Sequence, residues 1–333
     1  MHSIAFSPDG KYLVAGWDDD SAQMWNVQTG EVIHTFVHKD SISPNSISFS
    51  ADGKYVLLGE GLEATLWDSH TGKMLRAYPR THHELYSGLQ AMFVPNSQYI
   101  LTSSREGATL WTISGLKLHE FYENAEAEQW ASVSSDGKHL LIPAGFWELW
   151  DLETLQKLQS FESVSYTGFS PDGKFVLTNG GPGLVLYSIE TGKPAQTFVK
   201  GFSDDTWIFS PNGKYLATAD YSAGNLILLV WEVQSGQILS SFSFHDSYGF
   251  IDFLPDNENY IVVYREAKAD KPDQYSLHVW SIKEHKEMLM LDIEGYMGLE
   301  AFSPDGKYWV TGSGDEILEL WDIQDWRIIR RFC

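Results

Sequence analysis

One four-residue turn recurs along the whole chain and constrains the fold more than any other feature. It first occurs as Ser7-Pro8-Asp9-Gly10, and later copies begin at Ser50, Val94, Ser134, Ser170, Ser210, Leu254 and Ser303. Pro presets φ at the second position, Asp or Asn is tolerated at the third, and Gly accepts the left-handed conformation at the fourth. Apolar stretches flank each turn, so every copy predicts a pair of antiparallel strands.

A second landmark follows each turn, an apolar residue next to a large aromatic one. The aromatic residues are Trp25, Trp67, Trp111, Trp150, Tyr187, Trp231, Trp280 and Trp321. Successive side chains of a strand point to opposite faces, so such a pair buries both faces of a third strand. We interpret these aromatic residues as part of the structural core rather than as stacking platforms for nucleobases or sugars.

A second turn, such as Gln28-Thr29-Gly30, leads in most repeats to a fourth strand. These fourth strands carry a polar residue between apolar neighbours: His34, Arg76, His119, Gln159, Gln196 and Arg330. Polar residues at this place are typical of a sheet edge that is kept from pairing with another molecule. The fourth strands are therefore predicted to be the outer edges of their sheets.

The repeat period completes the prediction of the fold. The aromatic landmarks lie 37 residues apart from Trp150 to Tyr187 and 49 apart from Trp231 to Trp280, which is the period of propeller blades. One blade cannot bury both of its own faces, so blades must stack. We expect an all-β fold, an eight-bladed β-propeller with four antiparallel strands per blade, as a single domain over residues 1–333. The blades are predicted at about 3–36, 46–78, 89–121, 130–161, 165–198, 206–242, 249–291 and 298–332.

The repeats resemble the WD40 repeat family over nearly the whole chain. The Trp-Asp pair of that family stands at Trp67-Asp68, Trp150-Asp151 and Trp321-Asp322, whereas the usual Gly-His pair before the first strand is missing. The resemblance implies a rigid platform for protein interactions, either free-standing or part of a longer protein. Because the chain is in register with its own blades, we expect either that blades one and eight pack face to face or that the chain is a domain excised from a longer protein.

Charge and cysteine content narrow the classes of partner. Forty-five acidic residues against 23 basic ones give a formal net charge of −22, which repels phosphate backbones and anionic lipid. We therefore expect neither nucleic acid nor membrane as a partner, but a protein segment that is basic or of mixed charge. The single cysteine, Cys333, forms no intrachain disulfide, and the N-terminus has no secretory signal pattern. We expect a soluble, cytoplasmic protein that is monomeric outside a larger assembly.

No motif of the sequence predicts catalysis or a bound cofactor. The Gly-Lys pairs, as at Gly10-Lys11, open strands rather than helices and are not phosphate loops. His82-His83-Glu84 and Asp18-Asp19-Asp20 lack the spacing of a zinc or calcium site. We expect a non-catalytic protein without metal or cofactor. The alternative is a propeller enzyme, a hydrolase or similar to a lactonase, acting on a small molecule at the central channel.

The strand order predicts where partners bind. Loops from the fourth strand to the next first strand, and from the second to the third, emerge at one end of the blades, and they are rich in acids and aromatics. The candidate partner-binding residues of this rim are Trp17, Asp18, Asp19, His82, His83, Tyr86, Trp130, Asp204, Asp205, Trp207, His245, Asp246, Tyr248 and Tyr296. We expect them to bind an Arg- or Lys-bearing peptide, while core packing stays open for Trp130 and Trp207.

Overall fold

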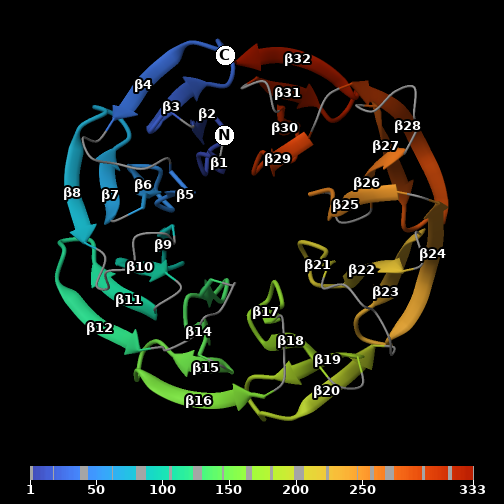
Figure 1. Cartoon of the computed structure of the whole chain (residues 1–333), viewed down its shortest axis with the longest axis horizontal. Helices are drawn as coiled ribbons and strands as arrows, with labels where there is room; N and C mark the ends of the chain where they lie inside the picture. Colours follow the sequence, from blue (N-terminus) through green and yellow to red (C-terminus); the bar gives the residue numbers. More distant parts are fainter. Residues whose placement is uncertain are drawn as a thin grey trace. The chain divides into compact units, whose positions relative to one another are not determined.

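The fold is taken from a computed structural model of the chain. It describes residues 3–17, 19–37, 44–61, 63–79, 88–104, 107–122, 130–144, 146–162, 167–180, 183–198, 206–222, 225–245, 247–255, 259–266, 274–294, 297–313 and 317–332. The strands form four-stranded antiparallel sheets in which neighbours in sequence are neighbours in the sheet (Figure 1). The sheets divide into two compact units, Met1–Ser160 with Met297–Cys333, and Phe161–Tyr296.

The first unit holds five sheets, each built from consecutive strands. The first two are β1 (Ser3–Phe6), β2 (Tyr12–Gly16), β3 (Ser21–Asn26), β4 (Val32–Val37), and β5 (Ser46–Phe49), β6 (Tyr55–Gly59), β7 (Glu63–Asp68), β8 (Met74–Pro79). The next two are β9 (Gln90–Phe93), β10 (Tyr99–Ser104), β11 (Gly107–Thr112), β12 (Lys117–Tyr122), and β13 (Ser132–Val133), β14 (His139–Pro143), β15 (Trp147–Asp151), β16 (Gln156–Phe161). The fifth is β29 (Met297–Phe302), β30 (Tyr308–Ser313), β31 (Leu318–Asp322) and β32 (Arg327–Phe332). Of these strands, only β16 extends one residue past the boundary of the unit.

The second unit holds three sheets. They are β17 (Thr167–Phe169), β18 (Phe175–Gly180), β19 (Gly183–Ser188), β20 (Pro194–Phe198); β21 (Thr206–Phe209), β22 (Tyr215–Ser222), β23 (Asn225–Glu232), β24 (Gln237–His245); and β25 (Ser247–Phe253), β26 (Asn259–Glu266), β27 (Gln274–Ser281), β28 (Lys286–Glu294). The last two sheets have strands of up to nine residues, whereas the strands of the first unit have at most six.

The predicted fold class is corrected in one respect. The chain is an all-β propeller whose blades have four antiparallel strands, as the repeats indicate. The prediction of eight equivalent blades is wrong, because the sheets fall into two compact units, five sheets in one unit and three in the other. The blades also differ in strand length, which the spacing of short turn motifs cannot reveal.

The recurring turn is held by its own side chains. In the second sheet, Ser50 Oγ donates to Asp52 Oδ1 at 2.8 Å, and the backbone N–H of Lys54 donates to the same oxygen at 3.1 Å. Gly53 has φ +71°, the left-handed conformation that the motif predicts. In the third sheet Asn96, and not the residue after it, takes the positive φ of 55°, because Asn tolerates this conformation better than Ser.

Most landmark aromatic residues pack against an aromatic residue from a neighbouring sheet, whereas Trp321 packs against Trp309 of its own sheet. Trp67 on β7 lies 5.3 Å, between ring centroids, from Phe36 on β4, and Trp231 on β23 lies 5.8 Å from Phe198 on β20. The indole N–H groups of Trp111, Trp231 and Trp321 donate to threonine hydroxyls on the second strand of their own sheets. The landmark residues are therefore buried or half-buried scaffold, as the sequence predicts.

The first and last sheets of the sequence pack face to face within the first unit. Phe332 on β32 is 2 % exposed, and its ring centroid lies 5.7 Å from that of Trp25 on β3. Both belong to a core cluster with Leu13, Val310 and Leu318. Of the two alternatives, the described residues show packing between the first and last sheets, and β1 and β32 each pair only within their own sheet.

Candidate functional site

The structure describes only part of the predicted rim. The residues Asp18, His82, His83, Tyr86, Asp204, Asp205, Asp246 and Tyr296 lie outside the described residues. The backbone of His245 ends β24 and that of Tyr248 lies in β25, but their side chains are not described. The geometry of the rim can therefore be given for four of its side chains.

The four described rim residues do not form one surface cluster. Trp17 is 6 % exposed and packs edge-on against Trp25, with ring centroids 6.0 Å apart. Asp19 is exposed, and its Oδ1 accepts from Ser21 Oγ at 2.6 Å. Trp130 and Trp207 are half-buried, and Trp207 packs against Phe209 within its own strand. Among these four residues, only Asp19 offers an exposed charge to a partner.

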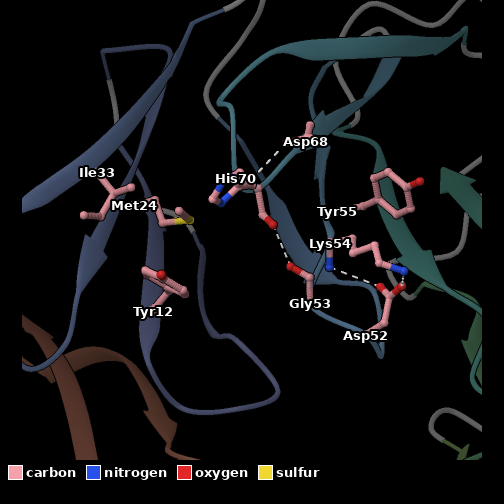
Figure 2. A pocket seen from close by; sticks show the side chains of 10 residues that line it. Tyr12, Met24, Ile33, Asp52, Gly53, Lys54, Tyr55, Asp68 and His70 are labelled. Atoms are coloured by element: carbon pink, nitrogen blue, oxygen red, sulfur yellow. Dashed lines mark hydrogen bonds and ion pairs between the residues drawn. The ribbon is translucent and has the colours of Figure 1, made fainter.

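A pocket lies at the other end of the sheets, between the first two sheets of the first unit. Its volume is about 370 Å³. In Figure 2, Tyr12, Met24 and Ile33 of the first sheet lie on one side of the pocket, opposite His70 and Gly53 of the second sheet. The remaining lining residues are Asp52, Lys54, Tyr55, Asp68 and Ser69. Sequence reasoning missed this site because its two walls come from different repeats.

The acids at the pocket are stabilised in their charged forms. A hydrogen bond from the Lys54 ammonium, with Nζ 2.7 Å from Asp52 Oδ2, lowers the pKa of Asp52 to about 2. The backbone N–H of Thr71 donates to Asp68 Oδ1 at 2.7 Å and holds the pKa of Asp68 below its ordinary value. The Asp52 charge is matched by Lys54, so Asp68 supplies the unmatched negative charge of the pocket.

The polar residues of the fourth strands have a role that the sequence did not reveal. His34 Nε2 lies 3.0 Å from the backbone oxygen of His70, in the second turn of the next sheet. Arg330 donates to the backbone oxygens of Gln28 and Thr29 in the first sheet. A side chain at Gly72 or Gly30 would collide with His34 or Arg330, respectively. These residues therefore join adjacent sheets. The regular recurrence of a polar fourth-strand residue and a glycine in the second turn of the next repeat is the sequence signal that could have indicated these contacts.

One further acid, Asp252 on β25, has a raised pKa. Burial raises the pKa of Asp252 on β25 to about 6, although its Oδ1 accepts the backbone N–H of Phe253 at 2.7 Å. Its neighbours Ile251 and Phe253 are buried and apolar. Within the part of the chain that the structure describes, no group of three or more His, Cys, Asp or Glu could hold a metal ion, and no helix is long and apolar enough to cross a membrane.

Comparison with known proteins supports the same family at both ends of the chain. The model of the anaphase-promoting complex subunit 4 WD40 domain matches residues 1–52, and that of the WD domain, G-beta repeat, matches residues 293–322. Apoptotic protease-activating factor 1 of Rattus norvegicus is 25% identical over 218 residues, covering 60% of this chain and 17% of the relative. Cilia- and flagella-associated protein 52 of Sus scrofa is 23% identical over 240 residues, covering 68% of this chain and 38% of the relative.

The matched stretch thus spans less than half of either relative. The two family models fall on the sheets whose packing joins the first and last repeats, and the same turn and aromatic landmarks recur between them. With four-stranded antiparallel sheets throughout the described residues, this chain is a WD40 repeat protein.

Proposed function

We propose that the protein is a non-catalytic interaction scaffold whose acidic rim binds a basic or mixed-charge segment of a partner protein. WD40 propellers generally mediate protein–protein contacts, and the match to two WD40 family models supports this role. Family membership alone does not select a partner, so the proposal for the partner rests on charge.

The distribution of ion pairs carries the proposal. Lysines of the recurring turns pair with the acid of the same turn, with Nζ to Oδ2 distances of 2.9 Å for Lys11–Asp9 and for Lys307–Asp305. On other strands Lys157 pairs with Glu148 and Arg331 with Glu319, each at 2.9 Å. With 45 acidic and 23 basic residues, the acids outnumber by 22 the lysines and arginines that could pair with them. Such a surface favours a basic partner and speeds its association.

The test compares two variants of equal charge. In the rim variant, Asp18, Asp204, Asp205 and Asp246 are changed to Asn. In the control variant, four exposed acids of the second turns, at the opposite end of the sheets, are neutralised: Glu31, Glu153, Glu190 and Asp325. Natural protein and both variants are used as baits in native lysate at low and raised salt, and captured proteins are quantified by mass spectrometry.

We expect the natural protein and the control variant to capture the same partners, which the rim variant loses and which raised salt releases. Equal capture by all three baits would contradict an acidic rim. Loss from the control variant alone would place the interaction at the turn end of the sheets instead.

The enzyme alternative receives no support from the described residues. Asp252 has a raised pKa, yet its sequence neighbours are apolar, and it does not line the pocket between the first two sheets. The single cysteine supports the proposal that the protein works in a reducing compartment such as the cytoplasm.

A further inference from the structure

Four residues on the fourth strands occupy equivalent register positions. His34 pairs with Met24, Arg76 with Leu66, Arg330 with Leu320, and Gln196 with Leu186, in each case the apolar residue just before the landmark aromatic one. Each of the four also lies against the glycine of the second turn in the next sheet. The junctions between neighbouring sheets can therefore be compared position by position.

The junction of the last and first sheets is spanned by a long cationic side chain. Arg330 Nη2 donates to the backbone oxygen of Gln28 at 2.8 Å, and Nη1 donates to that of Thr29. At the junction of the second and third sheets, the Arg76 side chain lies against Gly115. The molecule thus fills two of its junctions with its own arginine side chains.

The junction of the first and second sheets has a shorter residue at this position. His34 reaches the backbone oxygen of His70, which corresponds to Gln28 in the first sheet. The pocket of about 370 Å³ opens beside this contact, between Met24, the register partner of His34, and the turn that carries His70 (Figure 2). A long side chain is present at the equivalent place in the other two junctions and absent in this one.

We propose that this pocket binds one arginine side chain from an extended segment of a partner protein. Met24 and Ile33 offer an apolar wall for the aliphatic stem, and the rings of Tyr12 and His70 offer faces for a planar guanidinium. Asp68 supplies the negative charge that Lys54 does not match. This site lies at the opposite end of the sheets from the rim, so it is independent of the proposed rim function.

The experiment follows the Met24 methyl group by NMR after selective ¹³C labelling of the seven methionines, with Met24→Leu to assign the signal. The probe is N-acetyl-arginine N-methylamide, and the matched ligand is the citrulline analogue, which has the same shape without the charge. We expect a saturable shift with the arginine probe, with a Kd on the order of millimolar for so small a ligand, and a much smaller response to citrulline.

Three variants sharpen the test. His34→Arg fills the pocket from within, as Arg330 does elsewhere, and is expected to weaken probe binding at least about tenfold while raising Tm. Asp68→Asn keeps an acceptor for the turn, as Asn26 does in the first sheet, and is expected to weaken binding roughly threefold. His119→Arg, the same change on β12, is the control and should leave binding unchanged.

Four outcomes would overturn the proposal. These are the absence of a saturable Met24 shift, an equal response to citrulline, undiminished binding by the His34→Arg variant, and an equal loss of binding in the His119→Arg control. If His34→Arg does not fold, the Asp68→Asn variant and the citrulline comparison still decide the question.

Discussion

Two junctions of the first unit share an aromatic contact and differ in the residue that spans the turn. Between the last and first sheets, Phe332 packs on Trp25 and Arg330 spans the turn; between the first and second sheets, Phe36 packs on Trp67 and His34 spans the turn. The aromatic contacts are equivalent, with centroid distances of 5.7 and 5.3 Å. The comparison teaches that two junctions with equivalent aromatic contacts differ in the length of the residue that spans the turn, and that the pocket of about 370 Å³ lies at the junction with the shorter residue.

The largest expected effect is on the aromatic contacts that the two junctions share. Phe332→Ala and Phe36→Ala each remove a side chain that is at most 2 % exposed, and each should cost about 3–5 kcal/mol of unfolding free energy. Chemical denaturation followed by Trp fluorescence measures both. If the two junctions are equivalent, both variants should lose similar amounts of unfolding free energy. A difference above about 2 kcal/mol would show that the junctions are not equivalent.

The next effect concerns the second and third sheets, where Tyr78 takes the place of Phe36. The Tyr78 hydroxyl is buried and donates to the Ile113 backbone oxygen at 2.7 Å, so Tyr78→Phe should cost about 1–3 kcal/mol. Burial raises the pKa of Tyr78 to about 12, from an ordinary value of 10.0. The contribution of the neutral Tyr78 phenol to stability is therefore complete below pH 10 and is lost as the pH rises from 10 towards 12.

Denaturation of the natural protein and of the Tyr78→Phe variant between pH 8 and 11.5 tests whether the contribution of Tyr78 to stability falls as the pH rises. The difference between them should shrink as the pH rises above 10. Phe36→Tyr is the matched control, because it introduces a hydroxyl at the equivalent position of the first junction. A constant difference across this pH range would refute a role for the buried phenol.

A smaller effect is expected from exchanging the two residues that distinguish the junctions. Arg330→His removes one of two bonds to carbonyl oxygens and should cost about 1 kcal/mol, whereas His34→Arg should gain a few tenths to 1 kcal/mol. Thermal unfolding of both single variants and of the double exchange measures the changes. Destabilisation by His34→Arg would show that the pocket cannot accept a long cationic side chain.

The smallest effect concerns the turn acids. The pKa of Asp52 is lowered to about 2, chiefly by its hydrogen bond from Lys54, so its contribution to stability is present above pH 4 and is lost as the pH falls from 4 towards 2. The pair is exposed, and we expect Asp52→Asn to lower Tm by only about 1 °C at pH 7. A larger decrease that survives at high salt would show that the two hydrogen bonds to Asp52 Oδ1, rather than the ion pair, supply most of its contribution.

Much of this architecture could be predicted from the repeated residues. The turn around Gly53 and the burial of Trp25 follow from local rules, since a left-handed turn requires glycine and an apolar-aromatic pair buries both faces of a strand. The burial of Trp17 could not be predicted, because its neighbour Trp25 and the last sheet enclose it only in the folded chain. The contact of His34 with the backbone oxygen of His70 could not be predicted for the same reason.

The sequence by itself determined the strand order, the turn chemistry and the membership of the WD40 repeat family, because each depends on residues close together in one repeat. Only the tertiary structure decided that the sheets divide into two compact units and that a pocket lies beside His34. These features depend on side chains from different repeats, whose packing is set by the volumes and lengths of both partners rather than by either segment alone.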